Sequence, residues 1–277
     1  MSLPPPNVPR GTYEHLKTKA LAPRKVGEDE FDNQVSEVCQ YGRPEFWDNY
    51  FATEFEPFEW YYGYDVFKSI ITDNVEYNEK VLVCGIGSSR MLIDMVDDGY
   101  TNVIGNDISR VAIAQQKIKC EEYPQISFFT GNMLDTDLPA ASLDAIIDKA
   151  LLDSLLCTYQ SEVSVKQYVN EVERLLNENG KFIVISNGLP ENRLKFLEQY
   201  DIDEPNFTPW TMDVQAVIKP KQFAKEIVDP DNPECLYFMY IMTKTPELLN
   251  RRFRKEQRND ANARKVKKVV KTKASNL

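Results

Sequence analysis

The feature that most constrains the fold is a glycine-containing turn that follows a short apolar run. The run Val81–Cys84 leads into Gly85-Ile86-Gly87-Ser88-Ser89, and apolar residues at helical spacing follow over residues 91–96. A second apolar run, Val103-Ile104-Gly105-Asn106, ends in Asp107. These patterns predict a strand, a tight turn, a helix and a second strand with an acid at its tip. That arrangement is half of a nucleotide-type binding fold.

The residue types in this stretch favour an adenosine-containing ligand. Gly85 and Gly87 allow a sharp turn and a close approach of the backbone to a ligand, and the amides at the start of the next helix suit a carboxylate or a phosphate. Asp107, 20 residues after Gly87, is placed to accept hydrogen bonds from both hydroxyls of a ribose. A dinucleotide fingerprint requires a third glycine where Arg90 stands, so S-adenosylmethionine is a better candidate than a pyrophosphate cofactor.

Two further strand ends carry side chains that suit the same ligand. Residues 125–130 read as a third strand, and Asn132 and Met133 after it offer edge contacts and an apolar face for an adenine. Residues 142–147 read as a fourth strand that ends in Asp148-Lys149. Ligands of open α/β sheets bind beyond the carboxyl ends of the strands, where all these residues are expected to meet.

The rest of the chain continues the alternation of strands and helices. Residues 161–177 show helical spacing, and Asn179-Gly180 suits a helix C-cap. The pattern predicts an α/β class I (Rossmann-like) methyltransferase fold. Its sheet has seven strands, mostly parallel, in the order 3-2-1-4-5-7-6, with helices on both faces and an antiparallel last strand. The other expected elements are helices over residues 64–71, 151–156 and 191–199, and strands over 181–186, 212–218 and 235–243.

Charge divides the chain into an acidic part and a basic end. Residues 251–277 hold 11 basic and two acidic residues, which leaves 22 basic and 41 acidic residues and a charge of −19 in the rest. An acidic domain disfavours polyanions, attracts basic partners and suits a cationic sulfonium. We expect a flexible segment over residues 1–40, one domain over 41–244, and a basic, helix-prone tail over 245–277. The tail is either a solvated extension or a contact for RNA, the ribosome or a nuclear import receptor.

Composition also restricts the compartment and the chemistry. No apolar run approaches the ~18 residues that a membrane span needs, and the first ten residues lack the apolar core of a signal peptide. Five scattered cysteines without CxxC spacing indicate reduced thiols in a cytoplasmic or nuclear protein, and we expect a cytoplasmic one. The single histidine, His15, argues against a zinc site or a histidine-activated nucleophile, so we expect no metal.

Aromatic residues crowd the segment 41–64, with acidic residues between them. One interpretation is a cap that covers an edge of the sheet. The other is a lid over the cofactor, in which Trp47 and Trp60 face the sulfonium or the adenine.

Several stretches together resemble the methyltransferase-like enzymes that methylate lysines of translation elongation factor 1A, over about residues 41–244. They are Tyr41-Gly42, Phe46-Trp47-Asp48, Glu59-Trp60-Tyr61, the turn from Val81 to Ser89, Asp107-Ile108-Ser109 and Asp148-Lys149-Ala150-Leu151-Leu152-Asp153. The chain departs from the family's usual pattern in the middle of the glycine turn and at Phe51, Asn132 and Ala150. The resemblance implies cofactor contacts at Trp47, Phe51, Trp60, Gly85, Asp107, Ile108, Asn132, Met133 and Lys149, to which the turn itself adds Gly87.

The predicted function is therefore methyl transfer from S-adenosylmethionine to a protein lysine, with S-adenosylhomocysteine as product and a basic protein such as elongation factor 1A as substrate. We expect Asp148 to hold the substrate ammonium at the mouth of the site and Lys149 to position the cofactor. The alternatives are a methyltransferase for a small molecule or an RNA, and a non-catalytic adenosine-binding scaffold. The sequence has no Asn-Pro-Pro-Tyr-type motif, which argues against the adenine-N6 and glutamine classes.

Overall fold

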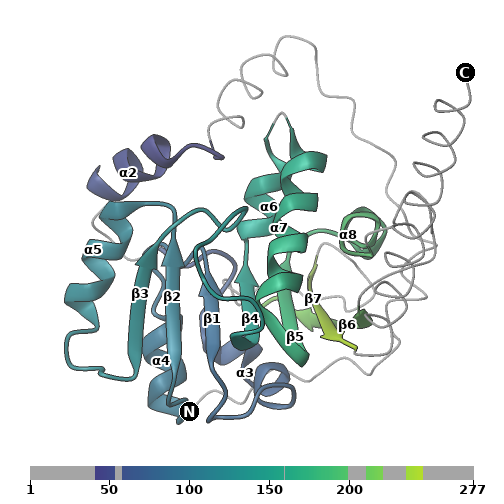
Figure 1. The fold of residues 1–277 in the computed structure, drawn as a ribbon, viewed down its shortest axis with the longest axis horizontal. Coiled ribbons are helices and arrows are strands. Elements are labelled where there is room, and N and C mark those ends of the chain that lie inside the picture. The colour runs from purple at the N-terminus through teal and green to yellow at the C-terminus, as the bar shows by residue number, and fades with distance from the viewer. Residues whose placement is uncertain (1–40, 54–57, 159, 199–209, 221–234, 246–277) are drawn as a thin grey trace, which may run out of the picture.

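The computed structural model describes residues 41–53, 58–158, 160–198, 210–220 and 235–245 (Figure 1). The N-terminal segment 1–40 and nearly all of the basic tail lie outside these described residues. The predictions of a flexible N-terminus and of a tail that contacts RNA or the ribosome therefore stay predictions.

The centre of the fold is a seven-stranded sheet in the order β3-β2-β1-β4-β5-β7-β6. The strands from β3 to β5 run parallel, while β7 lies antiparallel to both β5 and β6. This confirms the predicted class I methyltransferase fold, including the strand order and the antiparallel last strand. The strands are β1 (Val81–Cys84), β2 (Val103–Asp107), β3 (Ile126–Thr130), β4 (Leu143–Lys149), β5 (Leu176–Ser186), β6 (Trp210–Ile218) and β7 (Leu236–Lys244).

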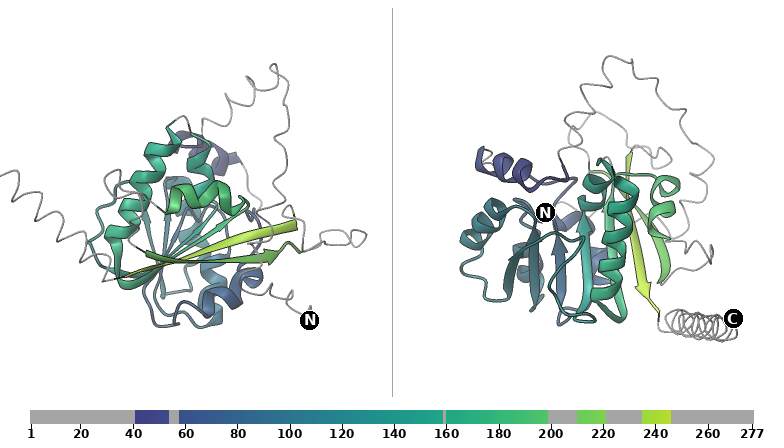
Figure 2. Two further views of the ribbon diagram at one scale, coloured as in Figure 1. Left: turned by 90° about the vertical axis from the view of Figure 1, so that its right-hand side faces the viewer. Right: turned by 45° about the horizontal axis from the view of Figure 1, so that its top comes forward.

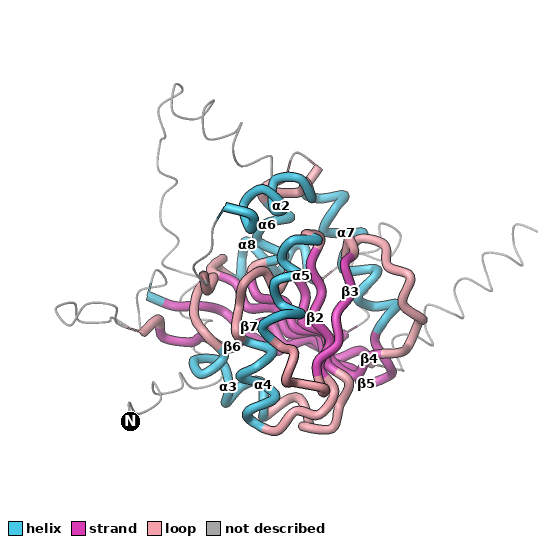
Figure 3. Tube along the Cα trace, turned by 90° about the vertical axis from the view of Figure 1, so that its left-hand side faces the viewer, coloured by secondary structure: helices cyan, strands magenta, loops and turns pink. Residues whose placement is uncertain are grey.

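Helices cover both faces of the sheet, as Figures 2 and 3 show. Successive side chains of a strand point to opposite faces, so Val81 and Val83 pack with one helical layer, α3, α4 and α5, and Leu82 and Cys84 with the other, α6, α7 and α8. The described residues include no helix long and apolar enough to cross a bilayer. The helices are α2 (Pro44–Thr53), α3 (Tyr64–Thr72), α4 (Met91–Asp98), α5 (Arg110–Lys119), α6 (Leu151–Leu156), α7 (Ser161–Leu175) and α8 (Pro190–Leu197).

The predicted boundary between the helix from residue 161 and the strand after it is wrong. We expected the helix from residue 161 to reach 177 and to be capped by Asn179-Gly180, but α7 ends at Leu175 and β5 begins at once with Leu176. Leu176 pairs with Leu143 of β4, and the next pair on β5 is formed by Lys181. Asn179 has a φ of 63°, which is a left-handed conformation. This conformation ends many helices, but it also occurs where a strand is irregular, as β5 is here.

The aromatic segment contains a helix that the sequence reasoning did not identify. This helix, α2, packs against α5 at the end where α5 begins, beyond the carboxyl end of β2 (Figure 1). It therefore stands over the same end of the sheet at which the predicted ligand-binding residues gather.

Candidate functional site

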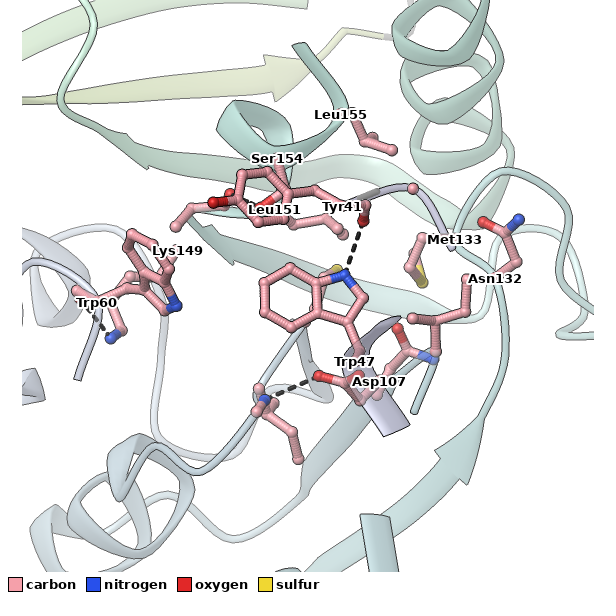
Figure 4. Close-up of a pocket in the computed structure, with 18 of the residues that line it drawn as sticks. Tyr41, Trp47, Trp60, Asp107, Asn132, Met133, Lys149, Leu151, Ser154 and Leu155 are labelled. Atoms are coloured by element: carbon pink, nitrogen blue, oxygen red, sulfur yellow. Dashed lines mark hydrogen bonds between the residues drawn. The ribbon is translucent and has the colours of Figure 1, made fainter. Parts of the chain in front are cut away.

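A cavity of about 340 Å³ lies at the carboxyl ends of β1, β2 and β4 and beside the segment that follows β3 (Figure 4). This volume is within the range of small-molecule sites. All ten residues predicted to contact the cofactor line this cavity: Trp47, Phe51, Trp60, Gly85, Gly87, Asp107, Ile108, Asn132, Met133 and Lys149.

The glycine turn between β1 and α4 is held from two sides. Gly85 and Gly87 have φ angles of +60° and +47°, a conformation in which other residues are strained. The Gly87 amide donates to an oxygen of Asp107 at 2.8 Å. On the other side, the buried amide group of Gln116 on α5 donates to the carbonyls of Gly87 and Ser89 at 2.8 and 2.9 Å. These hydrogen bonds fix the conformation of the turn from both sides.

The side chain of Asp107 is buried at the tip of β2. One carboxylate oxygen accepts from the Gly87 amide and the other from the Ser109 amide, each at 2.8 Å. Burial raises the pKa of Asp107, and these backbone amides oppose the shift because they favour the charged form. A carboxylate has about four acceptor sites, so lone pairs remain for ribose hydroxyls.

The helix α2 supplies an aromatic wall. The rings of Trp47 and Phe51 stack with centroids 5.9 Å apart and an interplanar angle of 24°. Asp48, between them in sequence, accepts a 2.6 Å hydrogen bond from the Ser109 hydroxyl, and Gln115 donates to the Phe51 carbonyl at 2.8 Å. These bonds fasten α2 to α5. Aromatic faces of this kind suit both an adenine and a sulfonium cation.

The two ends of the cavity differ in character (Figure 4). Asn132 and buried Met133 lie at one end, where a polar edge and an apolar face would hold an adenine. Trp60 and Lys149 lie at the other end. Asp107 lies between the two ends, so a cofactor with its ribose at Asp107 and its adenine at Met133 would have its charged, methyl-donating part at that second end.

The ammonium group of Lys149 is bound to the aromatic segment. It donates to a carboxylate oxygen of Glu59 at 2.7 Å and to the Trp60 carbonyl at 2.8 Å. Burial lowers the pKa of Lys149, and the Glu59 carboxylate opposes that shift. Sequence reasoning included Lys149 but not Glu59 or Gln116. Glu59 stands within the quoted Glu59-Trp60-Tyr61 stretch, whereas nothing local marks Gln116.

Asp148 does not lie where the sequence reasoning put it. Its side chain is fully buried and accepts hydrogen bonds from the amides of Leu151 and Leu152 and from the Tyr168 hydroxyl, at 2.8, 2.9 and 2.8 Å. Burial raises its pKa to about 7. Neighbouring side chains of a strand point to opposite faces, so Lys149 reaches the cavity and Asp148 caps α6 from the core. Asp148 therefore has no access to a substrate ammonium at the mouth.

The cavity has the features that S-adenosylmethionine requires. The glycine allows the aromatic wall to pack directly on the turn, since a Cβ on Gly87 would come 3.0 Å from the Phe51 ring. A carboxylate stands at the ribose position, and apolar rings line the wall. In the part of the chain that the structure describes, no group of histidine, cysteine or acidic residues could hold a metal ion.

Comparisons with known proteins agree with this geometry. A family model described as a methyltransferase domain matches residues 82–184. "EEF1A lysine methyltransferase 4" of Mus musculus is 26% identical over 174 residues, which cover 59% of this chain and 68% of that protein. "eEF1A lysine and N-terminal methyltransferase" of Homo sapiens is 31% identical over 151 residues, 53% of this chain but only 22% of that longer protein.

Proposed function

We propose that this chain, a class I methyltransferase, transfers a methyl group from S-adenosylmethionine to a lysine side chain of a protein, with translation elongation factor 1A as the substrate. The observation that carries the proposal is one cavity that joins the Gly87–Asp107 turn to an entrance of aromatic rings. The names of the two relatives support the choice of substrate. We assign the activity to residues 41–244.

When bound, S-adenosylmethionine supplies a methyl group on a sulfonium. The lysine ammonium would first lose a proton to water. Transfer of the methyl group to the neutral amine would then form the N–C bond, break the S–C bond and leave a methylated ammonium and S-adenosylhomocysteine. The residues of the chain align the reactants and exclude water. A free lysine has a pKa near ~10.4, and an apolar surrounding lowers it. The rings of Trp47, Phe58 and Trp60 around the cavity provide such a surrounding and therefore favour the neutral amine.

Charge supports a basic protein as substrate. The chain outside residues 251–277 carries −19, which attracts a basic surface and repels a polyanionic RNA except near the tail. We also propose that the protein is cytoplasmic, which agrees with a translation factor as its substrate. The basic tail is proposed as an additional contact with RNA or the ribosome.

The test is transfer of labelled methyl groups by the purified full-length chain. Unmethylated recombinant elongation factor 1A is incubated with labelled S-adenosylmethionine, and the labelled lysine is identified by mass spectrometry. We expect label on this protein, a rate that falls as salt rises because exposed charges are screened, and much slower labelling by the Asp107→Ala variant. A cell extract is treated in parallel with protease or RNase. Label that is lost only with RNase, or that stays in the small-molecule fraction, would favour an RNA or small-molecule methyltransferase. Absence of any transfer would favour a binding scaffold.

A further inference from the structure

Two exposed aromatic rings stand at the entrance of the cavity. Phe58 is 49% exposed and Trp60 is 45% exposed, and their rings meet edge to face with centroids 5.3 Å apart. Among the described residues, the other exposed large hydrophobic side chains, Tyr77, Ile118 and Val163, do not line the cavity. Exposed apolar area at the rim of a site is typical of a surface that receives a partner.

The segment that carries these rings, residues 58–60, is bonded at each of its residues. We call it the aromatic strap. The Ser88 hydroxyl bonds both the amide and the carbonyl of Phe58, at 3.0 and 3.2 Å. Lys149 bonds the Trp60 carbonyl. All of these bonds lead to the glycine turn after β1 or to the end of β4.

Glu59 makes the central attachment of the aromatic strap. One of its carboxylate oxygens accepts from the Arg90 amide at 2.6 Å, and the other accepts from the Ser89 hydroxyl at 2.8 Å and from Lys149 at 2.7 Å. The carboxylate thus joins the start of α4 to the end of β4. Glu59 points inward while Phe58 and Trp60 stay exposed, so the acid determines where the rings stand.

We propose that Glu59 is a positioning residue that holds Phe58 and Trp60 at the methyl-donating end of the cavity, where the two rings pack against the stem of the substrate lysine. The inference rests on the proposed function. The aliphatic stem of a lysine suits an apolar slot, and its ammonium is attracted to aromatic faces on the way in.

A role in stability alone is a poorer account of this ion pair. The side chain of Lys149 is 5% exposed and that of Glu59 is 27% exposed. Removing two charges from water offsets most of what their attraction contributes, so such a pair adds little to stability. The ion pair instead contributes a fixed geometry, because charge-assisted hydrogen bonds join Glu59 to two elements.

The experiment compares Glu59→Ala with Glu122→Ala, in which an exposed glutamate far from the cavity is removed. Three quantities are measured on the full chain: the Kd of S-adenosylmethionine, kcat and KM for elongation factor 1A, and the hydrogen exchange of the Arg90 amide without ligand. We expect Glu59→Ala to raise KM about tenfold, to change the cofactor Kd by less than about threefold, and to speed exchange at Arg90, because bonds to a charged acceptor are lost. Glu59→Gln keeps an acceptor for the Arg90 amide, so its KM should lie between those of the wild type and Glu59→Ala.

A second variant tests the entrance without touching the attachment. Phe58→Ala removes an exposed ring, so the fold should be retained, and KM should rise about as much as in Glu59→Ala with exchange at Arg90 unchanged. An unchanged KM in both variants overturns the inference, as does a cofactor Kd that rises in parallel with KM in Glu59→Ala. Failure of the proposed function is seen separately, in the wild-type chain, as an absence of protein-lysine transfer.

Discussion

The amide of Gly87 donates a 2.8 Å hydrogen bond to a carboxylate oxygen of Asp107, which joins the turn after β1 to the tip of β2. The same carboxylate lines the cavity. Asp107 therefore fixes the conformation of the glycine turn and presents its remaining lone pairs to a ligand, so one side chain connects the shape of the site with its chemistry.

Replacing Asp107 by alanine should weaken S-adenosylmethionine binding by about ten- to 150-fold. The ribose hydroxyls and the Gly87 amide lose a charged acceptor, which is worth roughly 1.5–3 kcal/mol. Isothermal titration calorimetry measures the change. The control is Asp213→Ala on edge strand β6, where the carboxylate accepts from Gln215 and lies outside the cavity lining. Wild-type affinity in Asp107→Ala would refute the ribose assignment.

Replacing Gln116 by methionine should lower cofactor affinity by about tenfold although the residue lies behind the turn. The variant keeps the length of the side chain but loses the two hydrogen bonds to the Gly87 and Ser89 carbonyls, each worth about 1 kcal/mol. Binding and thermal unfolding are compared with Gln125→Met, which changes an exposed glutamine. If the variant binds the cofactor like wild type, the two hydrogen bonds from Gln116 to the turn do not contribute to cofactor binding.

Replacing Asp48 by alanine should detach α2 and reduce cofactor affinity about three- to tenfold. The bond from the Ser109 hydroxyl lowers the pKa of Asp48, so the charged form makes the attachment at neutral pH. Proteolysis within residues 44–53 should become faster, while unfolding of the sheet should hardly change. Glu45→Ala, an exposed acid in the same helix, is the control. Equal proteolysis of both variants would show that Asp48 does not hold the helix.

Asp148 should make stability depend on pH between about 4 and about 7. Its pKa is about 7 in the folded chain, against about 4 when unfolded. In this window the folded state keeps a proton on Asp148 that the unfolded chain has lost. Asp148 therefore makes the free energy of unfolding fall as the pH rises, and this effect levels off above about pH 7. Asp148→Asn should remove that part of the slope. Denaturant unfolding at pH 5, 6, 7 and 8 measures it, and identical slopes for both proteins would contradict the assignment.

The sequence alone determined the fold class and identified ten of the residues that line the cavity. Strand and helix periodicities are local, and Gly87 reveals by its residue type that the chain turns sharply there. In a parallel sheet the carboxyl ends of the strands meet at one edge, so the position of Asp107 at the end of its strand was sufficient to place it at the cavity. For the same reason Asn132 and Lys149 were found from sequence.

Only the tertiary structure decided which side chains hold that wall in place. Gln116 reaches a turn 29 residues earlier, and Glu59 meets a lysine 90 residues later. No local pattern encodes such a partner, because it depends on how α5 and the aromatic strap pack against the sheet. The different directions of the Asp148 side chain and its neighbour Lys149 also depend on packing. Their order in the chain puts both at a strand end, but the pleat of β4 and the packing of α6 and α7 turn the acid into the core and the lysine into the cavity.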